Sequence, residues 1–295
     1  MKVFFNGFWG GFYDNNDPIN VKFFLQLLKD VYGVGPDGLE GLEVSFNIND
    51  ADILMESVFT NTTFVNHKPW KASFLYTGES YYADCMLHTL ASYTCILGFN
   101  YTGGNYVELP LYLLYLKSFP DMSLEPAKTI PNNYTTAVIS NSSVNERSIF
   151  LDRLDKRMPV MYGGGYKNNI GGKLQGHFAT DNLTAFYKNS KFVITMENTK
   201  IAHYITEKVI NGFRAGIIPI YWGSQHIYEH FNRNRIIVLE DISEASINTV
   251  IDRMENMSDE EYFKIVNEPI FNEGQSVDSI YNKALENIKR LVVKN

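Results

Sequence analysis

The segment from residue 191 to residue 224 constrains the fold of this chain more than any other stretch. An apolar run, "KFVITMEN" (191–198), is followed by a helical pattern, "YITEKVINGFRAG" (204–216), and then by a second apolar run, "IIPIYWGS" (217–224). Two short apolar runs joined by an amphipathic helix are typical of a strand–helix–strand unit, whose two strands lie parallel in one sheet. The segment therefore predicts an α/β fold.

The same alternation recurs on both sides of a polar stretch. Residues 118–143 are rich in proline, serine and asparagine, and we interpret them as a connecting segment. A chain of 295 residues is longer than one hydrophobic core usually serves, so two domains are expected. We place them at 1–140 and 141–275, followed by a C-terminal helix at 276–295 that packs back across the domains. Further strands are predicted at 2–8, 41–47, 51–59, 71–79 and 159–165, and helices at 19–33, 146–158, 182–190 and 242–258.

Composition excludes several classes of function. Residues 1–145 hold seven lysines, no arginine and fourteen acidic residues, a balance that would repel nucleic acid. No apolar run reaches the roughly 18 residues that cross a bilayer, and the apolar start of the chain is interpreted as a strand and not as a leader. The two cysteines, Cys85 and Cys95, are interpreted as thiols of a reducing compartment, so a soluble cytoplasmic protein is expected.

The polar residues of the second half gather where strands end and helices begin. Glu197 and Asn198 close one strand, and Thr206, Glu207 and Lys208 open the helix that follows. A helix N-terminus carries free N–H groups and a partial positive charge, to which Lys208 adds a full charge. This arrangement favours an anion such as a nucleotide diphosphate. Taken alone, Glu207 and Lys208 also fit a solvated helix start.

A longer block carries a resemblance to a known family. "FVITMENTKIAHYITEKVINGFRAGIIPIYWGS" resembles the donor-site signature of the α-1,3/1,4-fucosyltransferases, and the likeness is greatest to their soluble bacterial members. The stretches "FFNGFWGGF" and "FLYTGES" in the first half, and "NERSIFLDRL" and "VMYGGGYKNN" in the second, are similar to further segments of that family.

The resemblance implies a GT-B fold, in which two Rossmann-like α/β domains face each other with the active site in the cleft between them. It implies inverting, metal-independent transfer of L-fucose from GDP-L-fucose to a hydroxyl of an acceptor glycan, with an α-1,3-type linkage. The second half would bind the donor and the first half the acceptor. Transfer of another GDP-deoxyhexose, and a catalytically inactive glycan-binding relative, remain alternatives. The sequence does not indicate an oligomeric state.

The resemblance also assigns roles to single residues. Glu79, in the turn after the strand "FLYT", is the candidate base, although the bacterial pattern has asparagine where this chain has Ser80. Arg147 and Lys208 would neutralise the diphosphate, and Trp9 would stack on the acceptor sugar or lie in the core. The remaining candidates for donor contact are Gly164, Glu197, Asn198, Tyr204, Thr206 and Glu207.

Two further patterns mimic metal sites. "HIYEH", His226 to His230, matches the H-x-x-E-H zinc protease pattern but would need a third ligand, so we interpret it as a surface helix. "DAD", Asp50 to Asp52, mimics the D-x-D of metal-dependent glycosyltransferases but leads directly into an apolar strand. We therefore expect no metal site.

Overall fold

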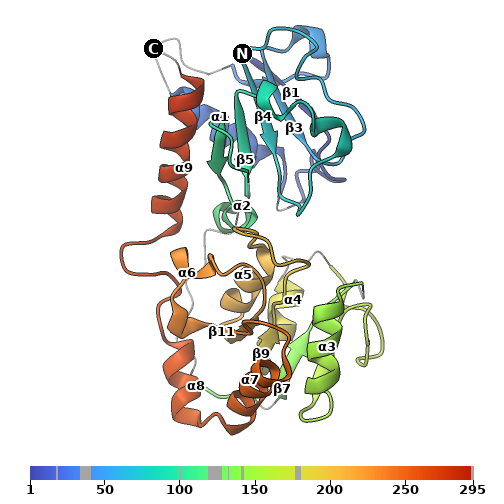
Figure 1. Ribbon diagram of the computed structural model, residues 1–295, viewed down its shortest axis with the longest axis vertical. Coiled ribbons are helices and arrows are strands. Elements are labelled where there is room, and N and C mark those ends of the chain that lie inside the picture. Colours follow the sequence, from blue (N-terminus) through green and yellow to red (C-terminus); the bar gives the residue numbers. More distant parts are fainter. Residues whose placement is uncertain are drawn as a thin grey trace. The chain divides into compact units, whose positions relative to one another are not determined.

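The computed structural model describes residues 1–17, 19–33, 41–99, 101–118, 128–131, 133–140, 143–176 and 181–293. The chain divides into two compact units, Met1–Pro120 together with Ser276–Asn295, and Asp121–Gln275. Each unit holds one parallel sheet (Figure 1). None of the helices in the described ranges has the length and the hydropathy that crossing a membrane requires.

The first unit is built on a six-stranded sheet of order β2-β1-β3-β4-β5-β6. β3 and β4 are buried at every position, as expected for central strands of a parallel sheet that is covered on both faces. Its strands are β1 (Lys2–Asn6), β2 (Glu43–Val44), β3 (Ile53–Ser57), β4 (Ala72–Tyr76), β5 (Cys95–Gly98) and β6 (Tyr106–Glu108).

Three α-helices of the described residues belong to this unit: α1 (Val21–Tyr32), α2 (Leu111–Ser118) and α9 (Val277–Val292). α9 is the last helix of the chain, yet it packs on the first unit (Figure 1). The hydroxyl of Tyr281 donates to Asp30 Oδ2 of α1 over 2.6 Å, and the ammonium of Lys117 at the end of α2 lies 4.6 Å from the Tyr281 ring. The amphipathic helix α9 therefore packs against α1 and α2.

The second unit is built on a five-stranded sheet of order β11-β10-β9-β7-β8. Read from β8, the order β8-β7-β9-β10-β11 repeats the order β2-β1-β3-β4-β5 of the first unit. The direction in which successive strands are added to the sheet therefore reverses between β1 and β3 in the first sheet and between β7 and β9 in the second. In such doubly wound sheets, ligands bind beyond the carboxyl ends of the strands at this reversal point. The strands are β7 (Asn133–Ala137), β8 (Val160–Tyr162), β9 (Ser190–Ile194), β10 (Ile218–Tyr221) and β11 (Ile237–Val238).

β7 corrects the interpretation of residues 118–143 as a connecting segment. The strand pairs with both β8 and β9, so it lies inside the sheet. Its inward positions are threonines instead of large apolar residues: Thr135 and Thr136 are fully buried, and the hydroxyl of Thr136 donates to the carbonyl of Met161 over 3.3 Å. A β-branched threonine suits a strand when its hydroxyl finds an acceptor, but it contributes no hydrophobic periodicity.

The helices of the second unit surround its sheet, and Arg235 is a buried cation among them. Arg235 is fully buried, and its Nη1 donates to the carbonyl of Ile217 over 2.9 Å. None of the described residues forms an ion pair with it, and burial lowers the pKa of Arg235 to about 10. The helices are α3 (Asn145–Leu154), α4 (Asp181–Tyr187), α5 (Glu207–Arg214), α6 (Ile227–His230), α7 (Glu244–Asn256) and α8 (Asp259–Val266).

Candidate active site

Glu197 lies at the centre of the polar cluster in the second unit. It follows β9, and its backbone N–H donates to the carbonyl of Trp222 over 2.8 Å, which extends the pairing between the ends of β9 and β10. Its side chain is fully buried. A buried carboxylate is costly unless it is paired and hydrogen-bonded, so its partners define the site.

Both carboxylate oxygens of Glu197 are bound by the start of α5. Oε1 accepts from the backbone N–H of Thr206 over 2.7 Å, and Oε2 accepts from the Thr206 hydroxyl over 2.7 Å. The ammonium of Lys208 lies 3.3 Å from Oε2. Thr206 is also the N-cap of α5, where its hydroxyl oxygen faces the backbone N–H of Lys208. Glu197 therefore fixes the first turn of α5 to the end of β9.

The charges of this cluster are coupled. Burial raises the pKa of Glu197, although Lys208 and the Thr206 hydrogen bonds lower it. Burial lowers the pKa of Lys208, but the carboxylates of Glu207 and Glu197 outweigh burial and raise it overall. One quarter of the Lys208 side chain is exposed, so this lysine is held in place without being closed off from solvent.

Arg147 reaches the end of β9 from the helix that follows the neighbouring strand β7. It belongs to α3, which follows β7, and β7 pairs with β9. Its side chain is buried, and Nη2 lies 3.1 Å from the carbonyls of Met196 and Glu197 and 2.9 Å from Asn198 Oδ1. Burial lowers the pKa of Arg147, and its charge in turn lowers that of Lys208, so the two predicted cations are near enough to interact.

The remaining predicted residues of this segment join the cluster. Tyr204 is buried and raises the pKa of Arg147 against the effect of burial. The Glu207 carboxylate lies 3.5 Å from the Lys208 ammonium and is only slightly exposed. Asn198 is exposed, and its amide oxygen accepts from Arg147. The structure thus assembles six of the predicted donor residues, together with Lys208, around one helix start.

Gly164 lies in the turn after β8, apart from these contacts. A β-carbon at this position would come within 2.1 Å of the carbonyl oxygen and 2.4 Å of the nitrogen of Ile139. The glycine is therefore required where this turn passes over the backbone that follows β7. Contact of Gly164 with a donor remains a prediction.

Two residues of the cluster went unassigned in the sequence although they stand in its most specific motif. A β-carbon on Gly223 would lie 2.7 Å from Cγ of Glu197, so the buried carboxylate needs a glycine opposite it. The Ser224 hydroxyl accepts from the backbone N–H of His203 over 2.8 Å, which holds the loop before α5. The Trp-Gly-Ser end of the quoted block was the signal for both.

Glu79 and Trp9 lie in the first unit. Glu79 is half-buried in the turn after β4, where its carbonyl accepts from the Thr77 hydroxyl over 3.1 Å. Trp9 follows β1, its indole N–H donates to the carbonyl of Ile19 over 3.2 Å, and its ring packs edge-on against Phe12. Trp9 also lines a cavity of about 300 Å³. Both residues follow strands that lie near the reversal point of this sheet, and their roles remain predictions.

A second buried carboxylate, in the first unit, was not anticipated. Glu56 stands near the end of β3, is fully buried, and has no lysine or arginine partner among the described residues. Four donors satisfy its two oxygens at 2.6–3.0 Å: the side chains of Asn6, Thr63 and Tyr93 and the backbone of Phe64. Neutral groups supply all of these bonds. Because the donors come from different segments, Glu56 ties β1, β3 and the loop after β3 together.

The D-x-D pattern has a structural explanation. Asp52 accepts from the backbone N–H of Lys2 over 2.9 Å and lies 3.5 Å from the Lys71 ammonium. The hydrogen bond from Lys2 is the main reason that the pKa of Asp52 is lowered. The aspartate therefore anchors the start of β1 beside β3.

Residues 129–265 match the family described as Glycosyltransferase family 10 (fucosyltransferase) C-term. The matched range contains every side chain of the cluster around Glu197. Residues 129–265 belong to glycosyltransferase family 10. The family predicted from the sequence is thereby confirmed, and the cluster is the polar centre of this family 10 domain.

Named fucosyltransferases match parts of this chain. The chain is 31% identical over 112 residues to the α-(1,3)-fucosyltransferase FucT of Helicobacter pylori, a match that covers 38% of this chain and 22% of that protein. It is 29% identical over 159 residues to α-(1,3)-fucosyltransferase B of Drosophila melanogaster, covering 48% of this chain and 36% of that protein. The chain therefore spans well under half the length of these relatives.

The fold of the whole chain is shared with solved structures. An α1,3-fucosyltransferase matches with a TM-score of 0.75 at 19% identity, covering 100% of this chain and 90% of that one. An α1,3-fucosyltransferase with GDP-fucose matches with a TM-score of 0.70 at 20% identity, covering 100% and 91%. At this identity the likeness speaks for the fold alone, and it confirms the predicted GT-B class with two Rossmann-like α/β domains.

Proposed function

We propose that this protein is an inverting, metal-independent glycosyltransferase that moves L-fucose from GDP-L-fucose to a hydroxyl of an acceptor glycan, forming an α-1,3-type linkage. The family 10 domain and the α-(1,3)-fucosyltransferase relatives support this reaction class. A GDP-fucose complex of a protein with the same fold supports the donor.

One observation carries the proposal: a fully buried carboxylate, Glu197, holds the ammonium of Lys208 at the N-terminus of α5, with Arg147 close by. A fixed cation at a helix N-terminus suits a diphosphate, because the N–H groups and the ammonium all favour negative charge. Charge develops on the diphosphate as the sugar departs, so cations held in advance stabilise the transition state. In this proposal the protein supplies that charge and the transfer step needs no metal ion.

The acceptor hydroxyl must lose a proton as it attacks the sugar. We assign that proton to Glu79, whose half-buried carboxylate follows β4. As the new bond forms from the acceptor oxygen to the anomeric carbon, the bond from that carbon to the diphosphate breaks, and GDP leaves with the electron pair. One displacement on the opposite face inverts the anomeric configuration. We also propose that the protein acts in the cytoplasm.

The reaction is tested by incubating the full chain with GDP-fucose and a panel of oligosaccharides, in EDTA, with mass spectrometry of the products. We expect one acceptor to gain a fucosyl group. Glu79→Gln should lower the rate by about 10²–10⁴-fold, the usual worth of a general base, with GDP affinity unchanged. Lys208→Met should weaken GDP binding by roughly 10- to 100-fold, the worth of one charge-assisted hydrogen bond.

Four results would contradict the assignment. Turnover of Glu79→Gln at the native rate removes Glu79 as the base. Native GDP affinity in Lys208→Met removes the diphosphate site. Transfer from another GDP-deoxyhexose in preference to GDP-fucose, or glycan binding with no turnover at all, changes the reaction itself.

A further inference from the structure

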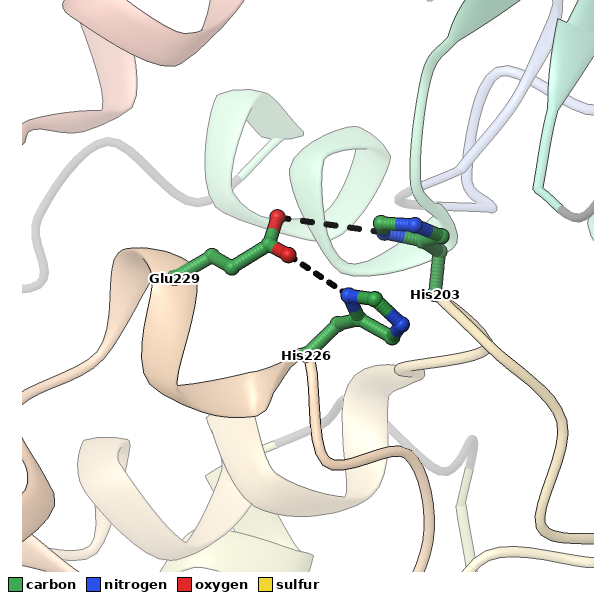
Figure 2. Close-up of side chains that lie close together, drawn as sticks. All are labelled: His203, His226 and Glu229. Carbon is green, nitrogen blue, oxygen red and sulfur yellow. Dashed lines mark hydrogen bonds and ion pairs between the residues drawn. The ribbon is translucent and has the colours of Figure 1, made fainter.

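Three side chains with metal-binding atoms converge beside the donor cluster: His203, His226 and Glu229 (Figure 2). One ligand atom from each lies within 4.8 Å of the others. Nδ1 of His226 is 2.5 Å from one oxygen of Glu229, and Nδ1 of His203 is 3.9 Å from the other oxygen. Both imidazoles therefore present the same kind of atom to one carboxylate.

The three residues come from two separate segments. His203 stands in the loop between β9 and α5, whereas His226 and Glu229 lie at the start of α6 and one turn into it, after β10. The buried hydroxyl of Ser224 joins the segments, because its oxygen lies 2.8 Å from the backbone nitrogen of His203 and 3.3 Å from that of His226. The fold thus holds two histidines from different loops in fixed register.

The two imidazole rings are stacked, with centroids 3.7 Å apart and planes inclined by 27°. His203 also has a backbone φ of +61°, a left-handed conformation that non-glycine residues seldom adopt. The chain holds this unfavourable conformation at the residue that completes the group.

We propose that His203, His226 and Glu229 bind one divalent transition-metal ion, with zinc the best fit. Two imidazole nitrogens and one carboxylate oxygen, with a fourth position open to water, form a known zinc ligand set. Ligand atoms around tetrahedral zinc are separated by roughly 3.4 Å, given bonds of about 2.0–2.1 Å, so small side-chain rotations close the site. The side chains are 27%, 38% and 49% exposed, so an ion enters from solvent.

The ion acts as a clamp on the loop before α5. This loop carries Tyr204 and Thr206, so fixing His203 to α6 restrains the segment that positions Lys208. The metal binds to native side chains brought together only by folding, so it stabilises the folded second unit by mass action. The metal site rests on these three side chains and does not depend on the proposed transferase activity.

The structure also distinguishes this site from the sequence pattern. In an H-x-x-E-H site the two metal-binding histidines would be His226 and His230. Here the second histidine is His203, from another loop, and His230 is not one of the three grouped residues. The interpretation of "HIYEH" as a helix agrees with α6, which forms as a short helix, and His203 would be the third ligand only in this proposal.

The experiment uses the full chain freed of metal with a chelator and then titrated with zinc by calorimetry, with cobalt absorption as a second readout. We expect about one zinc ion per chain and a visible cobalt spectrum of a four-coordinate centre. His203→Ala, His226→Ala and Glu229→Gln should each weaken zinc binding by at least the roughly 10- to 100-fold that losing a hydrogen-bond partner of a metal ligand costs. Glu229 is exposed, so its glutamine variant should fold normally.

His230→Ala is the matched control, one residue beyond Glu229 on the same short helix. It should bind zinc as the native chain does. Absence of zinc binding by the native chain overturns the proposal, as does equal binding by the three ligand variants. Loss of binding in His230→Ala with retention in His203→Ala would assign the ion to the sequence pattern instead. Because GDP titration reports the donor site separately, failure of the metal site leaves the proposed function standing.

Discussion

Replacing Lys208 by methionine tests the central electrostatic argument. The variant keeps an unbranched side chain of similar length but withdraws the cation that lies 3.3 Å from the fully buried Glu197 carboxylate. Breaking a fully buried ion pair on one side costs about 3–5 kcal/mol, because the other charge stays buried and unpaired. Lys208 is one quarter exposed and Glu197 keeps two hydrogen bonds from Thr206. We therefore expect a smaller loss in the free energy of unfolding, about 2–3 kcal/mol.

Glu197→Gln supplies the second edge of a double-mutant cycle. Its amide oxygen still accepts from the Thr206 N–H, and Lys208 keeps Glu207 and solvent, so the loss should be about 1 kcal/mol. In the double variant no charge is left buried without its partner. Its loss should therefore fall short of the sum of the two single losses by about 1–2 kcal/mol.

The free energies are measured by urea denaturation, followed by circular dichroism and by tryptophan fluorescence. Two probes are needed because a chain of two units can unfold in more than one step. Additive losses in the cycle, or an unchanged free energy of unfolding in Lys208→Met, would refute the claim that Glu197 and Lys208 are coupled. GDP titration of the same variants then separates stability from binding: Lys208→Met should lose affinity more than Glu197→Gln, since only Lys208 reaches solvent.

Three further outcomes follow from other sites. Arg235→Met should stabilise the second unit by about 1 kcal/mol in urea denaturation. Holding the pKa of Arg235 near 10 instead of 12.5 costs roughly 3 kcal/mol, and the carbonyl that loses its hydrogen bond to Arg235 offsets part of the gain from removing the charge. Destabilisation would contradict this. Gly164→Ala should lower the melting temperature, because its β-carbon has no room against the Ile139 backbone, whereas Gly104→Ala, with nothing within 4 Å, should not. The raised pKa of Lys208 contributes stability that is present below pH 10.5 and lost as the pH rises through the higher folded value. The stability difference between the native chain and Lys208→Met should therefore shrink above pH 10.5.

The sequence predicted the strands whose burial is continuous. β3 and β4 are apolar runs bounded by polar residues, and such runs need little context to be read as central parallel strands. β7 was missed because its inward threonines depend on Met158 and Met161, acceptors that only the folded sheet brings near. Hydrophobic periodicity does not detect a strand whose buried positions are polar and satisfied by tertiary partners.

The polar cluster was predicted as a set, but the division of labour within it was not. Residue type shows that Glu197 accepts hydrogen bonds, and position shows that it ends a strand. Only the structure shows that Thr206 and Lys208 take up both of its oxygens, so that it positions the cation. A carboxylate that contacts a ligand and one that orients a lysine have the same letter and the same spacing in the chain.

The histidine group shows why spacing along one helix does not nominate a partner that another loop supplies. A motif on a helix selects residues three or four positions apart, which requires a helix long enough to present both on one face. α6 has four residues, Ile227–His230, and a metal centre there needs a ligand from elsewhere. His203 provides it from 23 positions before His226, through a left-handed backbone and a hydrogen bond to Ser224. The left-handed backbone at His203 has no sequence signature, so loss of zinc affinity in His203→Ala would identify a ligand that only the tertiary structure could nominate.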